Sequence, residues 1–164
     1  MSLLVSLMSV ALLATGAQEE AGTVIYGSTA DSRVCYRYAA RGTVSTEAIA
    51  RCSTAMESAV TPRNRTASQA NRGVVYYNNG QFAEALADFT AVIEQSPPHA
   101  LHYLNRGLTL EQMAQTRPRY EAQARADYER ALALSPGNGT ARRRLTELDK
   151  PRLERTPLRR RIIS

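Results

Sequence analysis

Several residue types on which catalytic and metal sites depend are scarce in this chain of 164 residues. It contains no tryptophan, two cysteines and two histidines. His99 and His102 could share a helix face, yet no cysteine is near them in sequence to complete a metal-ligand set. Neither histidine stands in a catalytic context, and no glycine-rich phosphate loop occurs. We therefore expect no enzymatic activity, no cofactor and no metal site, and we interpret the histidines as a surface pair beside a turn.

Most of the chain also lacks a charge excess, although the net charge is +6. From residue 150 onward there are six basic residues and one acid, so the preceding part is close to neutral. A nearly neutral body argues against nucleic acid as the partner. The segment 150–164, which we expect to be disordered, either attracts an anionic envelope or membrane surface or keeps the chain soluble. Its cations are Lys150, Arg152, Arg155, Arg159, Arg160 and Arg161.

The first 17 residues contain no charged side chain and include an apolar run over 3–14. This run is shorter than the roughly 20 residues that a membrane-spanning helix needs. It has the length of a secretory signal core and is followed by small residues, so we expect cleavage after Ala17. An uncleaved anchor and a buried first helix are the alternatives, and 18–28 is expected to be extended. Because 20 arginines against one lysine suggest a GC-rich bacterial genome, we expect an exported, periplasmic protein.

Internal repetition is the strongest pattern in the sequence. The tripeptide Asn-Arg-Gly at 71–73 recurs 34 positions later at 105–107. The spacing Ala-x3-Phe-x2-Val-x4-Pro over 85–97 recurs as Ala-x3-Tyr-x2-Ala-x4-Pro over 124–136, which is 39 positions later. The second unit therefore has five additional residues, all located between the two patterns. A fixed period of this length is typical of solenoid repeats.

This arrangement resembles the tetratricopeptide repeat, a helix–turn–helix unit of 34 residues. The first unit carries the pattern residues Gly73, Tyr76, Gly80, Phe82, Ala85, Phe89 and Pro97. The second carries Tyr103, Gly107, Ala124, Tyr128, Ala131 and Pro136. The resemblance implies an all-α, short helix–turn–helix solenoid with one repeat over 63–97 and another over 98–136. The second repeat departs from the pattern at its turn, where the insertion includes Pro118.

Local signals predict where the helices of the two repeats begin and end. The stretch 66–69 reads as a capping box, so we expect a helix to start there. Gly80 can adopt a positive φ and is expected to end that helix. The resulting predictions are helices over 67–79, 82–95, 99–114 and 118–134.

Two glycines lie in the middle of predicted helices, where glycine costs about 1 kcal/mol relative to alanine. Gly73 and Gly107 make sense where the facing helix comes too close for a side chain. We expect Ala85 and Ala124 to be the small residues opposite them. The acids of these helices are at spacings that we interpret as solvated faces, and they are Glu84, Asp88, Glu94, Asp127 and Glu129.

The segments that flank the repeats are predicted to add helices at both ends of the solenoid. Residues 29–62 have apolar positions at helical spacing over 31–40 and 46–60, which indicates a degenerate helix pair. Residues 138–149 are predicted to form a cap helix with Leu145 and Leu148 inward and the arginines at 142–144 largely outward.

Cys35 and Cys52 fall on the two predicted helices of the degenerate pair, 17 positions apart. In an exported protein such a pair favours a disulfide that joins the helices. Two buried free thiols are the alternative, and it requires that the export prediction be wrong. No C-x-x-C spacing supports redox catalysis.

The resemblance implies a protein or peptide partner that binds the concave face formed by the first helix of each repeat. The set of groove residues carried over from the family lacks Lys and Arg, so a clamp for a terminal carboxylate is not predicted. We expect an extended or helical segment with apolar anchors as the ligand, or a groove filled by the chain's own residues 18–28. The groove residues are Ala70, Val74, Tyr77, Asn78, Leu104, Leu108, Glu111 and Gln112.

The alternative function is that of an envelope-surface binder that acts through the basic segment, with the repeats as a stable base. Salt would separate the two functions, because binding through exposed charges weakens with ionic strength and apolar binding does not. The sequence leaves the oligomeric state open.

Overall fold

The structure of the chain is a computed structural model that describes residues 29–156 and 158. The expected signal peptide, the segment 18–28 and the arginines Arg159, Arg160 and Arg161 lie outside the described residues. The described part contains α-helices and short 3₁₀ turns and no strand. The helices are α1 (Ala30–Arg41), α2 (Thr46–Glu57), α3 (Pro62–Asn78), α4 (Phe82–Gln95), α5 (Ala100–Ala114), α6 (Glu121–Leu134) and α7 (Gly139–Leu148).

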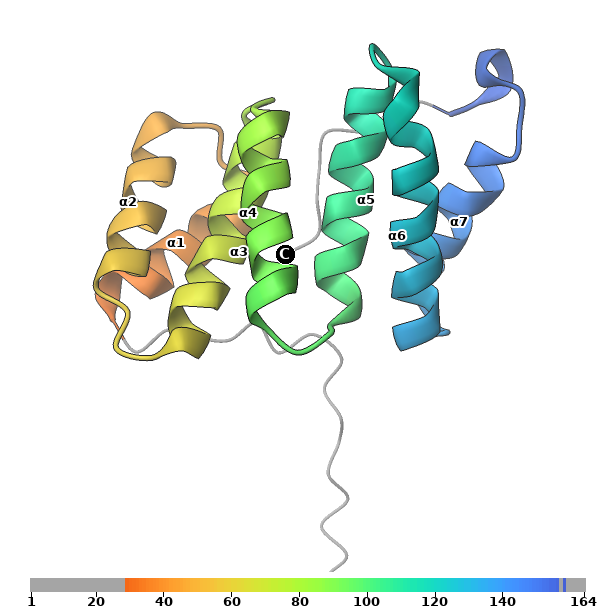
Figure 1. Cartoon of the computed structure of the whole chain (residues 1–164). Coiled ribbons are helices and arrows are strands. Elements are labelled where there is room, and N and C mark those ends of the chain that lie inside the picture. Colours follow the sequence, from red (N-terminus) through yellow and green to blue (C-terminus); the bar gives the residue numbers. More distant parts are fainter. Residues whose placement is uncertain (1–28, 157, 159–164) are drawn as a thin grey trace, which may run out of the picture.

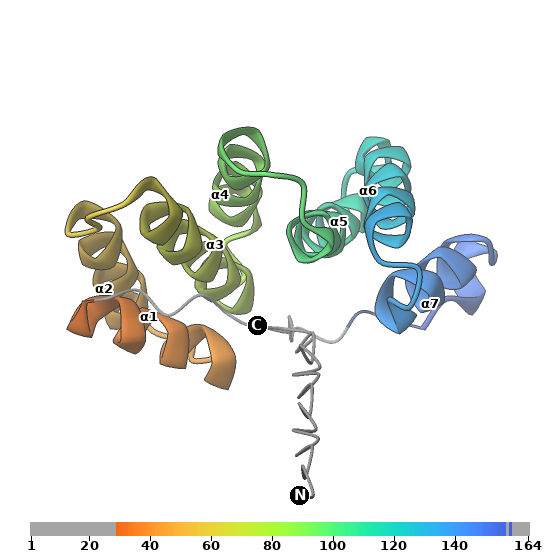
Figure 2. The same ribbon diagram turned by 90° about the horizontal axis from the view of Figure 1, so that it is seen from below.

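The helices form a curved row in which each packs against its neighbours in sequence, and α1 also packs against α3. Seen along the helices, α1, α3, α5 and α7 lie on the inner side of the curve and α2, α4 and α6 on the outer side (Figure 2). Sequential packing of this kind is that of a helical solenoid. The predicted all-α fold is thus confirmed. Within the described residues no helix has the length and apolar character needed to cross a membrane.

The helix α3 begins earlier than the sequence predicted. Thr61 is its N-cap, with a side-chain oxygen that accepts from the Asn64 backbone N–H, and Pro62 occupies the first turn, where a missing N–H costs nothing. Thr66 lies inside the helix, and its hydroxyl donates to the Pro62 carbonyl oxygen. The capping-box interpretation of 66–69 is therefore wrong. At the other end, Gly80 has a φ of 79° and follows the helix as expected.

Close approach at the two mid-helix glycines is confirmed, but the facing groups are not the ones expected. A Cβ on Gly73 would lie 2.8 Å from the ring of Phe89, and one on Gly107 would lie 2.8 Å from the ring of Tyr128. The alanines expected there are not the main neighbours, although the Ala124 carbonyl oxygen lies 3.3 Å from the Cβ position of Gly107. Each glycine therefore makes room for the large aromatic side chain of its own repeat.

The insertion in the second repeat forms a loop and a 3₁₀ turn, η1 (Pro118–Tyr120), between α5 and α6. The expected helix over 118–134 therefore starts three residues late, at Glu121. Proline fits the first position of a helical turn, and the chain enters α6 directly after it. The additional residues leave the packing of α5 against α6 intact.

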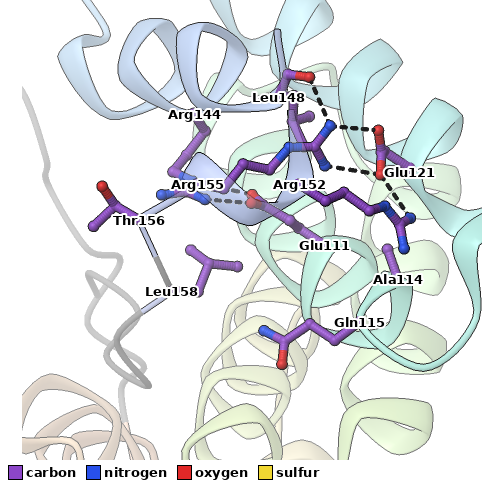
Figure 3. A pocket seen from close by; sticks show the side chains of 10 residues that line it. All are labelled: Glu111, Ala114, Gln115, Glu121, Arg144, Leu148, Arg152, Arg155, Thr156 and Leu158. Atoms are coloured by element: carbon purple, nitrogen blue, oxygen red, sulfur yellow. Dashed lines mark hydrogen bonds and ion pairs between the residues drawn. The ribbon is translucent and has the colours of Figure 1, made fainter. Parts of the chain in front are cut away.

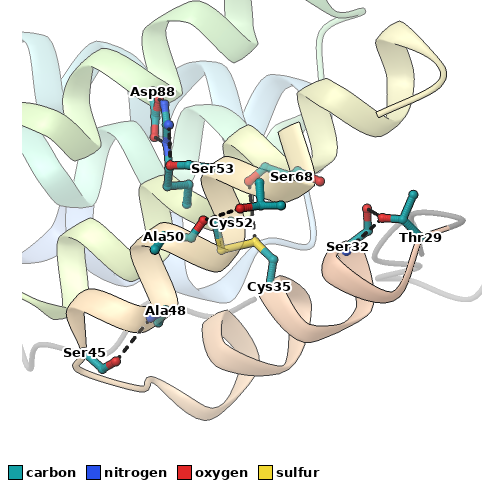
Figure 4. The surroundings of a disulfide bond; sticks show 12 residues. Thr29, Ser32, Cys35, Ser45, Ala48, Ala50, Cys52, Ser53, Ser68 and Asp88 are labelled. Carbon is teal, nitrogen blue, oxygen red and sulfur yellow. Dashed lines mark hydrogen bonds and ion pairs between the residues drawn. A yellow bond between two sulfur atoms is a disulfide. The ribbon is translucent and has the colours of Figure 1, made fainter. Parts of the chain in front are cut away.

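A disulfide joins Cys35 of α1 to Cys52 of α2, as predicted (Figure 4). The two Cα atoms are 4.7 Å apart, and both side chains are fully buried. The other side chains buried in these helices are small: Ser32, Ala39, Ala48 and Ala55. A covalent link thus supplements a helix pair that has little large apolar surface to bury.

The segment after α7 is not disordered over 150–156, contrary to expectation. It contains a 3₁₀ turn, η2 (Arg152–Glu154), and it folds back toward α6. Arg155 and Thr156 make hydrogen bonds to groups on α6, on α7 and just after α7. Leu153 within the turn is fully exposed, whereas Leu158 is half-buried.

Candidate functional site

The eight residues predicted to line the groove lie on the two central inner helices. Ala70, Val74, Tyr77 and Asn78 are on α3, and Leu104, Leu108, Glu111 and Gln112 are on α5. In each helix their offsets are zero, four, seven and eight residues, which place them on one face. We call this set of eight residues the inner face.

The inner face is nearly inaccessible in the structure. Ala70 is half-buried, and the other seven residues have exposed fractions of 8% or less. Leu104 and Leu108 are 3% and 5% exposed, although their helix, α5, lies on the inner side of the curved row. The structure therefore brings the predicted residues together, but as a covered face and not as an open row of side chains.

One hydrogen bond links the two helices across the inner face. The Gln112 amide nitrogen lies 3.3 Å from the Tyr77 hydroxyl oxygen and donates to it. At the C-cap of α5, the Gln115 amide donates to the Gln112 side-chain carbonyl oxygen at 3.0 Å. The Tyr77 ring also meets Phe82 of α4 edge-on, with centroids 5.4 Å apart. A polar row thus runs from α3 along α5 to Gln115.

Asn78 is the polar residue of the inner face with the fewest hydrogen bonds to the described part of the chain. Its side chain is 6% exposed, and among the described residues neither the amide nitrogen nor the amide oxygen has a hydrogen-bond partner. A buried polar group without a partner costs about 1–3 kcal/mol. Its neighbour Asn79 differs at the amide nitrogen, which donates to the Ser45 carbonyl oxygen at 3.3 Å, whereas the Asn79 amide oxygen also has no partner among the described residues. Asn78 therefore offers a donor and an acceptor that the described part of the chain leaves unused.

Glu111 takes part in a buried network of hydrogen bonds. The sequence had predicted that this side chain would contact a partner protein. The Tyr128 hydroxyl of α6 donates to one carboxylate oxygen at 2.6 Å. Arg144 of α7 donates to both oxygens. Burial, and then the nearby carboxylate, raise the pKa of Tyr128 well above its usual value. Glu111 thus ties α5, α6 and α7 together.

Arg144 was expected to point outward and is instead 6% exposed. The signal was present in the sequence, because Ala141, Arg144 and Leu148 have the spacing of one helix face. The two arginines before it in α7 are exposed, as expected.

Two of the acids interpreted as solvent-facing, Asp88 and Asp127, are buried. Asp88 and Asp127 are 4% and 5% exposed. Arg72 donates to both oxygens of Asp88 at 2.9 and 2.8 Å, and Arg106 donates to both oxygens of Asp127 at 2.8 Å. Such two-point ion pairs are geometrically specific. Because the pair recurs in both repeats, it belongs to the repeat architecture and not to a site of reaction.

A cavity of about 310 Å³ opens beside the inner face, between α5, α6, α7 and the segment after α7 (Figure 3). Arg155 donates to both oxygens of Glu121, and Arg152 adds a third contact. These bonds, that of Arg155 first, lower the pKa of Glu121 to about 2. Arg152 and Arg155, predicted as free cations of a basic tail, are thus engaged within the fold. The cavity is also lined by Glu111, Ala114, Gln115, Arg144, Leu148, Thr156 and Leu158.

The two histidines contact each other at the start of α5. His99 is the N-cap, and its Nδ1 accepts from the Leu101 backbone N–H. His102 is half-buried, so the expectation of a surface pair is wrong for it. Burial, and then His99, lower the pKa of His102 to about 4. Within 29–156 and 158, no three His, Cys, Asp or Glu side chains come together as a metal site requires.

Comparison with protein families matches residues 67–99 to the tetratricopeptide repeat. This range takes in most of α3, all of α4 and the link to α5, and it contains the inner-face residues of α3. Comparisons with curated proteins and with solved structures gave no significant match.

Proposed function

We propose that the chain is a tetratricopeptide-repeat protein, a member of a family of protein-interaction modules, and that its inner face binds a segment of a partner protein without catalysing a reaction. The partner segment runs along α3 and α5, where the predicted groove residues converge. The two repeats present this face jointly, because the Tyr77–Gln112 hydrogen bond holds α3 and α5 in register.

The observation that carries the proposal is the side-chain amide of Asn78, which has no hydrogen-bond partner among residues 29–156 and 158. A side-chain amide has the same donor and acceptor pair as a peptide group, so it can hydrogen-bond to the backbone of an extended ligand. Burial of that amide without a partner is unfavourable, and a ligand that supplies the missing bonds recovers about 0.5–1.5 kcal/mol for each.

The chemistry of the inner face selects an apolar ligand with few charges. Val74, Leu104 and Leu108 are its aliphatic members. Its one charged side chain, Glu111, is neutralised by Arg144. An extended or helical segment with branched apolar anchors is therefore the expected partner, and a free terminal carboxylate is not.

Export to an oxidising compartment is part of the proposal. The support for it is the apolar run over 3–14 and the pairing of both cysteines of the chain in one disulfide. A periplasmic protein would meet its partner in the cell envelope.

The alternative, binding of an anionic surface by the basic segment, has less support. The Arg152 and Arg155 guanidinium groups are paired with Glu121, and Lys150 is paired with Glu147. Half of the six cations that would attract an anionic surface are thus already matched by acids of the fold.

The test uses peptides selected from a displayed random library on the immobilised, oxidised full chain. Asn78→Ala is expected to weaken binding of the selected peptides about tenfold, which equals about 1.4 kcal/mol. Its thermal midpoint should not fall, since Asn78 has no hydrogen bond to lose among the described residues.

Asn79→Ala is the matched control. It removes the hydrogen bond to Ser45 and should lower stability slightly while leaving peptide affinity unchanged. Equal peptide affinity in the parent and in Asn78→Ala would contradict the proposal. Binding that vanishes at moderate salt in all three proteins would favour the basic segment instead.

A further inference from the structure

The cavity beside the inner face carries an excess of positive charge (Figure 3). Among the described residues, three arginines and two glutamates line it, and its other lining side chains are uncharged. Glu111 is paired with Arg144. Glu121 is paired with both Arg152 and Arg155. One guanidinium charge is therefore left over, and an anion with a single negative charge would complement it.

Arg152 is the lining cation with the most unused hydrogen-bonding capacity. A guanidinium has five N–H groups. Arg155 donates from all three of its nitrogens, to Glu121 and to two backbone carbonyl oxygens. Arg152 donates only from Nη2, to Glu121 at 2.8 Å, and its Nε and Nη1 have no partner among the described residues. Its side chain is 47% exposed, so a ligand can reach these groups.

The surroundings of Arg152 already stabilise one carboxylate ion. The bonds from Arg155, and then those from Arg152, hold the pKa of Glu121 at about 2, below its usual 4.5. Guanidinium groups match the planar carboxylate group at two points. A phosphate monoester, which carries close to two negative charges at neutral pH, would exceed the single positive charge that is available. The charge of the cavity therefore favours a carboxylate.

The remaining wall of the cavity is apolar. It consists of Ala114 and Leu148, which are 5% and 4% exposed, and the half-buried Leu158. The volume of about 310 Å³ is at the lower end of the range for small-molecule sites. Because one water takes about 30 Å³ in the liquid, the cavity has room for about ten non-hydrogen atoms. A carboxylate that carries a short branched aliphatic chain fits this size and this lining.

We propose that this cavity binds such a branched aliphatic carboxylate, either as a free acid or as the terminal residue of another chain. The carboxylate accepts from the unused N–H groups of Arg152, and the aliphatic part packs against Leu148 and Leu158. None of the eight inner-face residues is a Lys or Arg, so this site is separate from the inner face. The inference stands without the proposed function, because its test involves no ligand of the inner face.

The experiment titrates the oxidised full chain with 4-methylpentanoate at constant ionic strength and follows the backbone amide signals by NMR. Signals of 114–115 and 148–156 should shift with a Kd on the order of 1 mM, and those of 48–55 should not move. 4-Methylpentanamide has the same shape without the charge, and acetate has the charge without the aliphatic chain. Each should bind about tenfold more weakly or less. Equal binding of the acid and the amide would overturn the inference.

Two variants separate the two halves of the site. Arg152→Gln should weaken binding of 4-methylpentanoate about tenfold, with an unchanged circular dichroism spectrum because Arg155 keeps both bonds to Glu121. Arg143→Gln removes an exposed arginine of α7 and should leave binding unchanged. Leu158→Ala should weaken binding of 4-methylpentanoate but not of acetate. Equal affinity in the parent and in Arg152→Gln would contradict the site.

A peptide identifies the source of the carboxylate. Acetylated glycyl-glycyl-leucine with a free carboxylate should move the same signals if the natural ligand is a chain end, and its amidated form should not. If 4-methylpentanoate binds and the peptide does not, the ligand is a free acid. Absence of shifts with both compounds would overturn the inference.

Discussion

The two ends of the solenoid are held by different chemistry. At the amino-terminal end, α1 and α2 bury only small side chains and are joined by the Cys35–Cys52 disulfide. At the carboxyl-terminal end, α7 is joined to α5 and α6 by the buried ion pair of Arg144 with Glu111. A terminal helix of a solenoid has a neighbour on one side only, so it needs a contact stronger than ordinary packing.

This difference makes the two ends sensitive to different conditions. A disulfide acts chiefly by restricting the unfolded chain and responds to reductant. Removing one partner of a buried ion pair strongly destabilises the fold, because the other charge is left buried without a counter-ion. The first repeat uses neither device, whereas the second supplies Glu111 and its hydrogen-bond donor Tyr128 to the carboxyl-terminal network. Phe89 and Tyr128 fill equivalent places against the glycines of their repeats. Each end can therefore be weakened separately.

The largest expected effect is at the carboxyl-terminal end. Arg144→Met leaves Glu111 buried and without its cation, which should cost about 3–5 kcal/mol of unfolding free energy. Denaturant titration measures the loss. Arg143→Met, at the exposed neighbour, should change stability by less than about 0.5 kcal/mol. Similar losses in both variants would show that α7 is not held by this pair.

The amino-terminal end should respond next most strongly. Cys35→Ser combined with Cys52→Ser removes a link across 17 positions, and the expected cost is about 3 kcal/mol. Hydrogen exchange should accelerate in α1 and α2 and stay unchanged in α7. Equal acceleration at both ends would contradict their independence.

The central repeats should lose stability equally when their glycines are filled. Gly73→Ala and Gly107→Ala each drive a methyl group to 2.8 Å from an aromatic ring, and overpacking of this kind costs about 1–3 kcal/mol. Gly139→Ala is the control, because nothing lies within 4 Å of its Cβ position. The thermal midpoint should fall by the same amount in Gly73→Ala and Gly107→Ala and should not fall in Gly139→Ala. Unequal losses in the first two would break the equivalence of the repeats.

The smallest effect concerns acid and the segment after α7. Arg155, then Arg152, hold the pKa of Glu121 at about 2, below its usual 4.5. A carboxyl with a lowered pKa stabilises the fold above pH 4.5, and this contribution is lost as pH falls from 4.5 toward 2. Exchange of the Arg155 amide, corrected for intrinsic rate, should rise over that window while α1 and α2 stay protected. An unchanged rate would show that the Glu121 contacts do not hold the segment.

The solenoid was predictable because the recurring Asn-Arg-Gly and the aromatic and proline spacings mark the two repeats directly. The buried acids were less visible. Asp88 lies three residues after Ala85 and one before Phe89, which is within the apolar stripe of α4, but its partner Arg72 is on another helix. Pairing between helices depends on how they pack, and spacing along one helix does not reveal it.

The inner face likewise could be predicted only as far as contacts within one helix. Helical spacing placed its eight residues together, since offsets of four, seven and eight define one side of a helix. It could not reveal that Glu111 faces Arg144 from a helix 33 positions away, or that Arg155 turns back to Glu121. These contacts arise because the row of helices curves and brings its last elements against α5 and α6.

The most direct test of the function is hydrogen exchange of the oxidised full chain with and without a library-selected peptide. We expect new protection in α3 around Asn78 and in α5 around Gln112. Protection confined to residues 150–158, with α3 and α5 unchanged, would contradict binding at the inner face.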